Sequence, residues 1–143
     1  MNATNTTNNS AESSGAPRRA VRVIVVEDEK DSLSTLVGLL QSEGHEVRGV
    51  GSAKELWGTL PDFEPDICLV DIGLPDRSGY DIAQEMVRRF GDDRPKMIAV
   101  TAWTQSSDRI LAKIAGFDRH VGKPYDPTAL LALVSDITNG SGR

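Results

Sequence analysis

The chain has 143 residues, of which 38% are hydrophobic and 26% charged, and its formal net charge is −5. This composition is typical of one soluble domain with a single core, and the negative charge argues against a nucleic-acid binder that works by neutralising phosphates. No apolar run approaches the roughly 20 residues of a membrane span, and the N-terminus lacks the apolar segment of a secretory signal. We therefore expect a cytoplasmic globular domain with no membrane or nucleic-acid partner.

The first 20 residues differ in composition from the rest of the chain. Asn, Thr, Ser, Ala and Gly dominate there, without apolar periodicity. Such a segment cannot bury enough apolar surface to offset the entropy of ordering it, so residues 1–20 are predicted to be a disordered tail. Residues 21–138 are predicted to form one domain, and residues 139–143 a flexible end. The single cysteine, Cys68, lies within an apolar run and is expected to be a buried, inert thiol.

Short apolar runs alternate along the chain with helical patterns. The apolar runs lie at 21–26, 67–70 and 97–100, weaker strand patterns lie at 45–50 and 119–121, and an amphipathic helical pattern follows each of the five. Apolar runs without polar alternation indicate strands buried on both faces, and helices between such strands imply right-handed crossovers. The sequence thus predicts an α/β fold in which helices cover both faces of a five-stranded parallel sheet.

Several residues predict where the helices begin and end. Gly44 is placed to end the first helix, and Ser52–Glu55 has the spacing of a capping box that opens the second. Pro61 and Pro65 are expected to bracket the turn between that helix and the third strand. Asp126–Pro127 pairs an N-cap residue with a proline at the first helical position and opens the last helix.

Polar residues stand at the ends of four of the predicted strands. Glu27 and Asp28 follow the first strand, Asp71 ends the third, Thr101 ends the fourth and Lys123 follows the fifth. In a doubly wound sheet the carboxyl ends of all strands lie on one edge, where ligands bind. We expect these side chains to form one site although they are far apart in the sequence.

The chemistry of this set favours phosphoryl transfer. Three carboxylates in one pocket raise one another's pKa, and a cation relieves that cost. Oxygen ligands without His or Cys favour Mg²⁺, which keeps positions open for a phosphoryl group. Lys123 supplies a second positive charge and Thr101 a hydrogen-bond donor. Asp71 would then be the nucleophile and would form an acyl phosphate.

The motifs together resemble the receiver domain of response regulators over residues 21–138. They are Glu27-Asp28 after the first strand, Asp71 in Asp-Ile-Gly-Leu-Pro, Thr101-Ala102 after the fourth strand and Lys123-Pro124 before the last helix. The resemblance implies a flavodoxin-like (βα)5 sandwich of three layers with the strand order 2-1-3-4-5. It also implies a place in a two-component phosphorelay.

The resemblance implies a role for each acidic residue. Asp71 would accept a phosphoryl group from the phosphohistidine of a sensor histidine kinase or a histidine phosphotransfer protein. Asp28 and Asp71 would bind Mg²⁺ directly, together with the backbone carbonyl of Gly73. Glu27 stands where many receivers have Asp, and would reach the metal through water.

The remaining motif positions concern the switch. By resemblance, Thr101 is the hydroxyl that moves toward the phosphate, and Lys123 pairs with the phosphate through a loop in which the Lys123–Pro124 bond is cis. His120 occupies a position where many receivers have Tyr or Phe. It is either a partly exposed histidine without a signalling role or a weakened, pH-sensitive switch. Trp103 either shields the acyl phosphate or is a surface aromatic residue.

The resemblance implies a phosphorylation-dependent signalling module, not a turnover enzyme, that catalyses only its own phosphorylation and dephosphorylation. Its switching surface would span Gln105–Ile137 and bind a downstream protein, with the chain as a monomer or a phosphorylation-dependent dimer. Because no output domain follows Ile137, the chain is expected to be a stand-alone receiver or an excised piece of a larger protein. The main alternative is a pseudo-receiver that binds partners without phosphorylation.

Two other functions fit the sequence less well. An aspartate-nucleophile phosphatase would need an Asp-x-Asp pattern where the chain has Glu27-Asp28-Glu29. A flavin or nucleotide binder would need a phosphate loop rich in Gly, Ser and Thr at the same place, where the acidic run instead repels phosphate.

Overall fold

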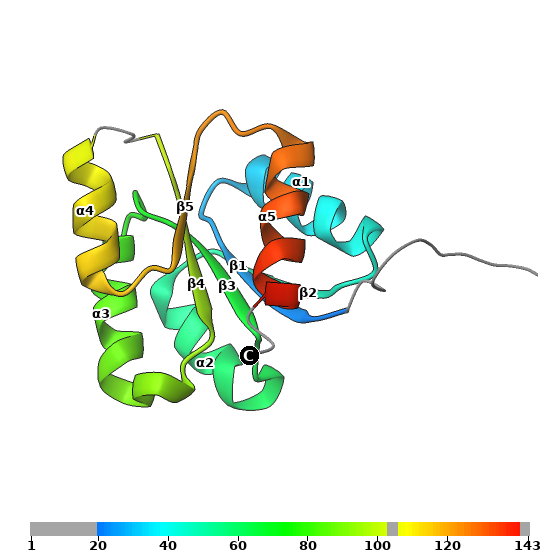
Figure 1. Cartoon of the computed structure of the whole chain (residues 1–143). Coiled ribbons are helices and arrows are strands. Elements are labelled where there is room, and N and C mark those ends of the chain that lie inside the picture. The colour runs from blue at the N-terminus through cyan, green and yellow to red at the C-terminus, as the bar shows by residue number, and fades with distance from the viewer. Residues whose placement is uncertain (1–19, 103–105, 141–143) are drawn as a thin grey trace, which may run out of the picture.

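A computed structural model describes residues 20–102 and 106–140, so residues 1–19 of the predicted tail at 1–20, residues 103–105 with Trp103, and the last three residues lie outside the described residues. A parallel sheet forms the centre of the molecule (Figure 1). The strand order is β2-β1-β3-β4-β5 with every neighbouring pair parallel, as the resemblance implied. The strands are β1 (Arg22–Val26), β2 (Glu46–Val50), β3 (Ile67–Asp71), β4 (Lys96–Thr101) and β5 (Arg119–Gly122).

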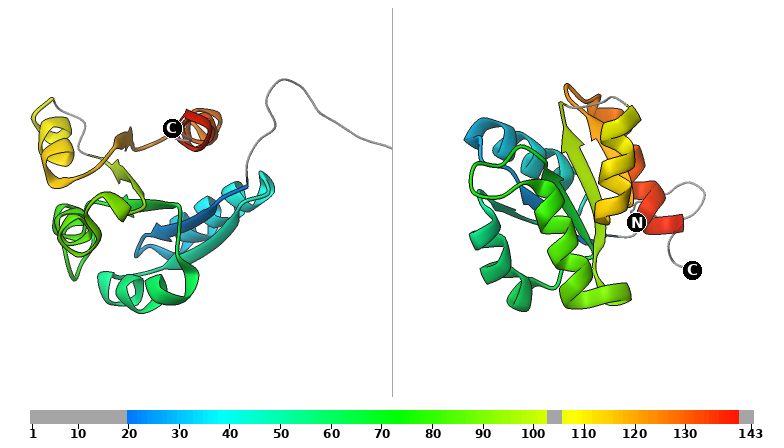
Figure 2. Two further views of the ribbon diagram at one scale, coloured as in Figure 1. Left: turned by 60° about the horizontal axis from the view of Figure 1, so that its bottom comes forward. Right: turned by 90° about the vertical axis from the view of Figure 1, so that its left-hand side faces the viewer.

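Helices cover both faces of this sheet, which confirms the predicted three-layer α/β sandwich. Figure 2 shows α1 and α5 on one side of the sheet and α2, α3 and α4 on the other. None of the helices in the described ranges is long and apolar enough to cross a membrane. The helices are α1 (Lys30–Ser42), α2 (Ala53–Phe63), α3 (Gly79–Phe90), α4 (Ser106–Ala115) and α5 (Pro127–Gly140), with a short 3₁₀ turn η1 (Gly91–Asp93) after α3.

Alternate residues of β1, β3 and β4 enter two separate apolar clusters, because successive side chains of a strand point to opposite faces. In β1, Ile24 and Val26 pack toward α2, α3 and α4, whereas Val23 and Val25 pack toward α1 and α5. Both faces of these three strands are apolar, which explains why they appear in the sequence as continuous apolar runs. The helices contribute Leu56, Phe63, Ile82, Met86 and Ala112 to the first cluster and Leu36, Leu40, Leu130, Val134 and Ile137 to the second.

Most of the predicted helix ends are confirmed. Gly44 follows the C-cap of α1 with φ of +90°, a conformation that glycine adopts without strain. Ser52 Oγ accepts from Glu55 N at 3.2 Å, and Asp126 Oδ1 accepts from Thr128 N at 3.2 Å. Glu55 closes the capping box one residue further out than expected, because its Oε1 accepts from Gly51 N at 2.7 Å.

The prediction that Pro61 lies in the turn after α2 is wrong. Pro61 lies inside the last turn of α2, which continues to Phe63. A proline there removes one backbone hydrogen bond, but Leu60 and Phe63 on either side are buried in the core and hold the turn. The helix ends instead at Glu64, which has φ of 53°.

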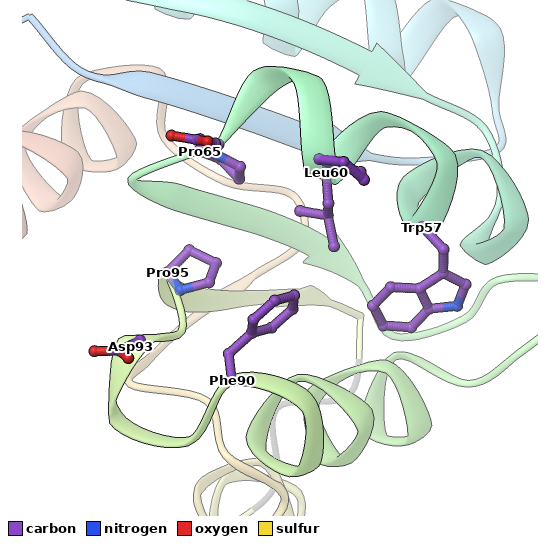
Figure 3. A pocket seen from close by; sticks show the side chains of 8 residues that line it. Trp57, Leu60, Pro65, Phe90, Asp93 and Pro95 are labelled. Carbon is purple, nitrogen blue, oxygen red and sulfur yellow. The ribbon is translucent and has the colours of Figure 1, made fainter.

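An apolar hollow of about 440 Å³ lies between α2 and the end of α3 (Figure 3). Trp57 and Phe90 line it together with Pro65 and Pro95, which stand near the amino-terminal ends of β3 and β4. The guanidinium of Arg89 lies 4.3 Å from the centre of the Trp57 ring. Trp57 is therefore a packing residue at a helix edge, as predicted, and the hollow lies on the sheet edge opposite the polar strand ends.

Candidate functional site

The carboxyl edge of the sheet brings the predicted acidic residues together. Glu27, Asp28 and Asp71 each offer a carboxylate oxygen, and these oxygens lie within 4.8 Å of one another. The backbone fixes their positions, because Glu27 N donates to Val50 O at 3.0 Å and β1 pairs with β3 in register. Glu27 is almost fully buried, Asp71 is partly buried and Asp28 is exposed.

Lys123 reaches this cluster from the end of β5, two strands away from β3 at the same edge of the sheet. Its Nζ lies 3.1 Å from Glu27 Oε1 and 3.2 Å from Asp71 Oδ2. Its backbone N donates to Thr101 O at 2.8 Å, so Lys123 directly follows the last residue of β5 that pairs with β4. The Lys123–Pro124 bond is cis, as the resemblance implied. The ammonium is thus the counter-charge of two carboxylates that come from different strands.

The electrostatics of the cluster follow from burial and from these contacts. Burial raises the pKa of Glu27, and this outweighs the hydrogen bonds from Glu29 N and Lys123, which lower it. Burial alone would lower the pKa of Lys123, but the hydrogen bonds and charges of Glu27 and Asp71 raise it overall. The site therefore holds a fully charged lysine beside a carboxyl group that gives up its proton less readily than usual.

Thr101 and Gly73 complete the predicted set. Thr101 is buried at the end of β4, one strand away from Asp71. Gly73 is exposed in the loop after β3, and its N–H donates to Asp71 Oδ1 at 3.0 Å. All six residues predicted for the site thus lie at one edge of the sheet. His120 lies in β5, partly buried beside α4, and this placement leaves both interpretations of it open.

The donor set fits a hard divalent cation. Its three carboxylates are oxygen ligands, one of them exposed to solvent, and they carry more negative charge than Lys123 alone offsets. Asp28 has no ion-pair partner recorded within the described ranges, so it is available to a metal. A bound Mg²⁺ would supply positive charge toward a phosphoryl group, and Asp28 and Asp71 are placed to hold it.

Sequence reasoning missed two contacts near the site. The carboxylate of Asp76, in the loop after β3, accepts from Ala53 N at 3.2 Å, across 23 residues. Glu29 is the N-cap of α1, and its side chain accepts from Ser32 N at 2.7 Å. The contact of Asp76 had no signal in the sequence, because an Asp in a loop that contains Pro is common without one. The contact of Glu29 could have been anticipated from its place just before a predicted helix.

The family model of the response regulator receiver domain matches residues 23–135, which is most of the chain. The chain belongs to the response regulator receiver family. Among curated proteins, this receiver is 34% identical over 115 residues to the response regulator SaeR of Staphylococcus aureus. That match covers 80% of the chain and 49% of SaeR, so the chain spans about half the length of the curated relatives it matches.

Solved receivers share the fold. A CheY-like response regulator receiver domain protein of Methanospirillum hungatei is 26% identical, with a TM-score of 0.76 over 85% of this chain and 96% of that one. A putative response regulator of Chloroflexus aurantiacus is 24% identical, with a TM-score of 0.78 over 85% and 99%. The receiver is therefore a module of two-component signalling with the fold that its motifs predicted.

Replacing Lys123 by Gln is expected to destabilise the metal-free receiver. Without the ammonium, the buried carboxylate of Glu27 and the partly buried carboxylate of Asp71 repel each other. We expect a loss of about 1–2 kcal/mol near neutral pH, a figure discounted for solvent screening because the lysine side chain is 30% exposed. Since the pKa of Glu27 is raised, the folded state binds this proton more tightly than the unfolded state, and acid removes the repulsion. The deficit should therefore shrink as the pH falls.

Urea unfolding of the wild type and Lys123→Gln at about pH 8 and about pH 5, without divalent metal, measures this effect. Lys54→Gln is the matched control, because Lys54 is exposed on α2 and has no ion pair recorded in the described part of the chain. A deficit that grows on acidification would contradict the assignment of Lys123 as the counter-charge.

Proposed function

We propose that this receiver accepts a phosphoryl group on Asp71 from the phosphohistidine of a sensor histidine kinase or a histidine phosphotransfer protein, with Mg²⁺ as the required cofactor. The observation that supports the proposal most strongly is the position of Asp71. It is the carboxylate that ends the central strand β3, it contacts Lys123 at 3.2 Å and it shares an acidic cluster with Glu27 and Asp28. A nucleophile, a cationic partner and a metal-binding set thus occur together.

The proposed reaction is an in-line transfer. A carboxylate oxygen of Asp71 forms a bond to phosphorus, the phosphorus–nitrogen bond of the donor breaks, and the imidazole leaves with the bonding electron pair. Lys123 is within reach of the Asp71 carboxylate and would pair with the incoming phosphoryl oxygens. Thr101, buried on the neighbouring strand, would donate its hydroxyl to the same oxygens. Water attack on the acyl phosphate later returns the carboxylate.

In this proposal the receiver is a switch and not a turnover enzyme. Its catalysis is limited to its own phosphorylation and dephosphorylation, and the added charge shifts a two-state surface formed by α4, β5 and α5. Part of that surface is suited to a protein partner, because Ile110, Leu111 and Ile114 of α4 expose 59%, 52% and 74% of their surface. The receiver would act as a monomer or as a phosphorylation-dependent dimer.

The test is labelling by a small phosphodonor. Incubation with acetyl phosphate and Mg²⁺, followed by mass spectrometry of the intact chain and of its peptides, is expected to place one phosphoryl group on the peptide that contains Asp71. Omitting Mg²⁺, or adding a chelator, should suppress the labelling. A receiver that stays unlabelled with Mg²⁺ would instead support the pseudo-receiver alternative, in which the same surface binds partners without phosphorylation.

A further inference from the structure

We infer that Asp76 is a positioning residue for the metal site, because its bond to α2 fixes the loop that presents Gly73 beside Asp71. The inference rests on the proposed function, since it concerns the Mg²⁺ that the acidic cluster would hold. It assigns to Asp76 a role that the sequence did not suggest.

The loop between β3 and α3 is anchored at both of its ends. Ile72 N donates to Val100 O at 3.1 Å, and Gly79 N donates back to Ile72 O at 2.9 Å. The side chain of Leu74 is buried in the core. Between these anchors, the tip at Pro75–Arg77 is exposed to solvent. The position of the tip therefore depends on whatever polar contact it makes with another element.

Asp76 makes that contact. Its Oδ1 and Oδ2 lie 3.4 Å and 3.2 Å from Ala53 N. Ala53 is the first residue of α2, so its N–H has no partner within the helix, and a carboxylate at a helix N-terminus is favoured by the helix dipole. Ala53 is also buried, with 2% of its surface exposed. An exposed loop tip is thus tied to a position that the core holds fixed.

The tie matters because of what lies three residues earlier in the loop. Gly73 N donates to Asp71 Oδ1, which orients the carboxylate of the proposed phosphoacceptor, and the carbonyl of Gly73 is the proposed third metal ligand. Groups that orient metal ligands affect metal affinity strongly even without touching the metal. Asp76 acts on Gly73 through the loop backbone, so we expect an effect below the usual range, a loss of about 3–10-fold in affinity when the tie is removed.

The experiment uses Mn²⁺ as the probe, because electron paramagnetic resonance measures its binding without any phosphoryl transfer. Asp76→Ala is expected to weaken Mn²⁺ binding by about 3–10-fold. Asp76→Asn keeps an oxygen acceptor for Ala53 N and should recover most of the affinity. Ser52→Ala is the matched control, because it removes the other cap of the same helix, the bond to Glu55 N, without touching the loop. Its affinity should stay within about twofold of the wild type, although it too lowers stability.

Hydrogen exchange in the metal-free protein gives a second readout. Amides of residues 72–79 should exchange faster in Asp76→Ala than in the wild type, and Ser52→Ala should leave them unchanged. An unchanged Mn²⁺ affinity or unchanged loop exchange in Asp76→Ala would overturn the inference. An equal loss of affinity in Ser52→Ala, or an Asp76→Asn as weak as Asp76→Ala, would overturn it too, because helix stability or net charge would then account for the effect. A wild type that binds no Mn²⁺ contradicts the proposed function itself, and this failure is visible without any variant.

Discussion

Asp71→Asn is expected to abolish labelling by acetyl phosphate, with a fall of at least about 100-fold in the rate of phosphoryl incorporation. The amide that replaces the carboxylate is a poor nucleophile, and it removes one of the three charges that would attract the metal. The fold should survive, because the one oxygen of the amide can still accept from Gly73 N, and Lys123 keeps its bond to Glu27 Oε1 when it loses the one to Asp71 Oδ2. The loss should therefore appear in intact-mass spectra while the unfolding midpoint changes little.

Two controls make this result specific. Asp76→Asn changes the same residue type in the same loop, five residues further on, and should still be labelled on Asp71. Asp66→Asn changes an exposed carboxylate at the opposite end of β3, where Asp66 accepts from Arg22 N, and should be labelled at the wild-type rate. Labelling that persists in Asp71→Asn would move the phosphoacceptor to another residue.

Gly79→Ala is expected to destabilise the protein by about 3 kcal/mol, at the upper end of the cost of overpacking. A Cβ on Gly79 would lie 2.7 Å from Ile72 Cα and 2.9 Å from Asp71 O, closer than such atoms approach in proteins. Both neighbours are backbone atoms, so no side-chain rotation relieves the clash. Helix α3 must move away from the end of β3, and this shift disturbs the backbone at Asp71, the last residue of that strand. We therefore expect slower labelling as well as lower stability.

Urea unfolding measures the loss of stability, and Gly58→Ala is its control. Gly58 lies in the middle of α2, and a Cβ there would meet no atom within 4 Å. Alanine at that position should stabilise the protein by up to about 1 kcal/mol through helix propensity alone. A Gly79→Ala variant that unfolds within about 0.5 kcal/mol of the wild type would show that the approach of α3 to β3 is not tight.

Local patterns in the sequence were enough to predict the elements of the fold. The buried strands produce apolar runs, and the polar residues that end those runs mark the carboxyl edge of the sheet. The order of the strands came from the resemblance and not from the runs themselves, because any permutation of parallel strands gives the same periodicity. Pro61 was misplaced because its helix propensity is poor, while the burial of Leu60 and Phe63 around it depends on packing that no local pattern records.

The candidate site was predictable in its membership but not in its contacts. Lys123 lies 96 residues after Glu27 and 52 residues after Asp71 in the sequence, and only the fold brings the three together. That Lys123 pairs with both carboxylates could not be read from the sequence. The bond from Asp76 to α2 was unpredictable for the same reason, since the fold alone brings the loop after β3 beside the first residue of α2.

The burial of Cys68 gives this protein an internal reporter of its own unfolding. The thiol is the only one in the chain, it lies on the central strand β3 with none of its surface exposed, and burial raises its pKa to about 12. A thiol reagent in the solvent therefore reacts at a rate set by how often β3 separates from its neighbours. The same strand carries Asp71, so the stability of the structure that supports the phosphoacceptor can be followed without introducing a label or a mutation.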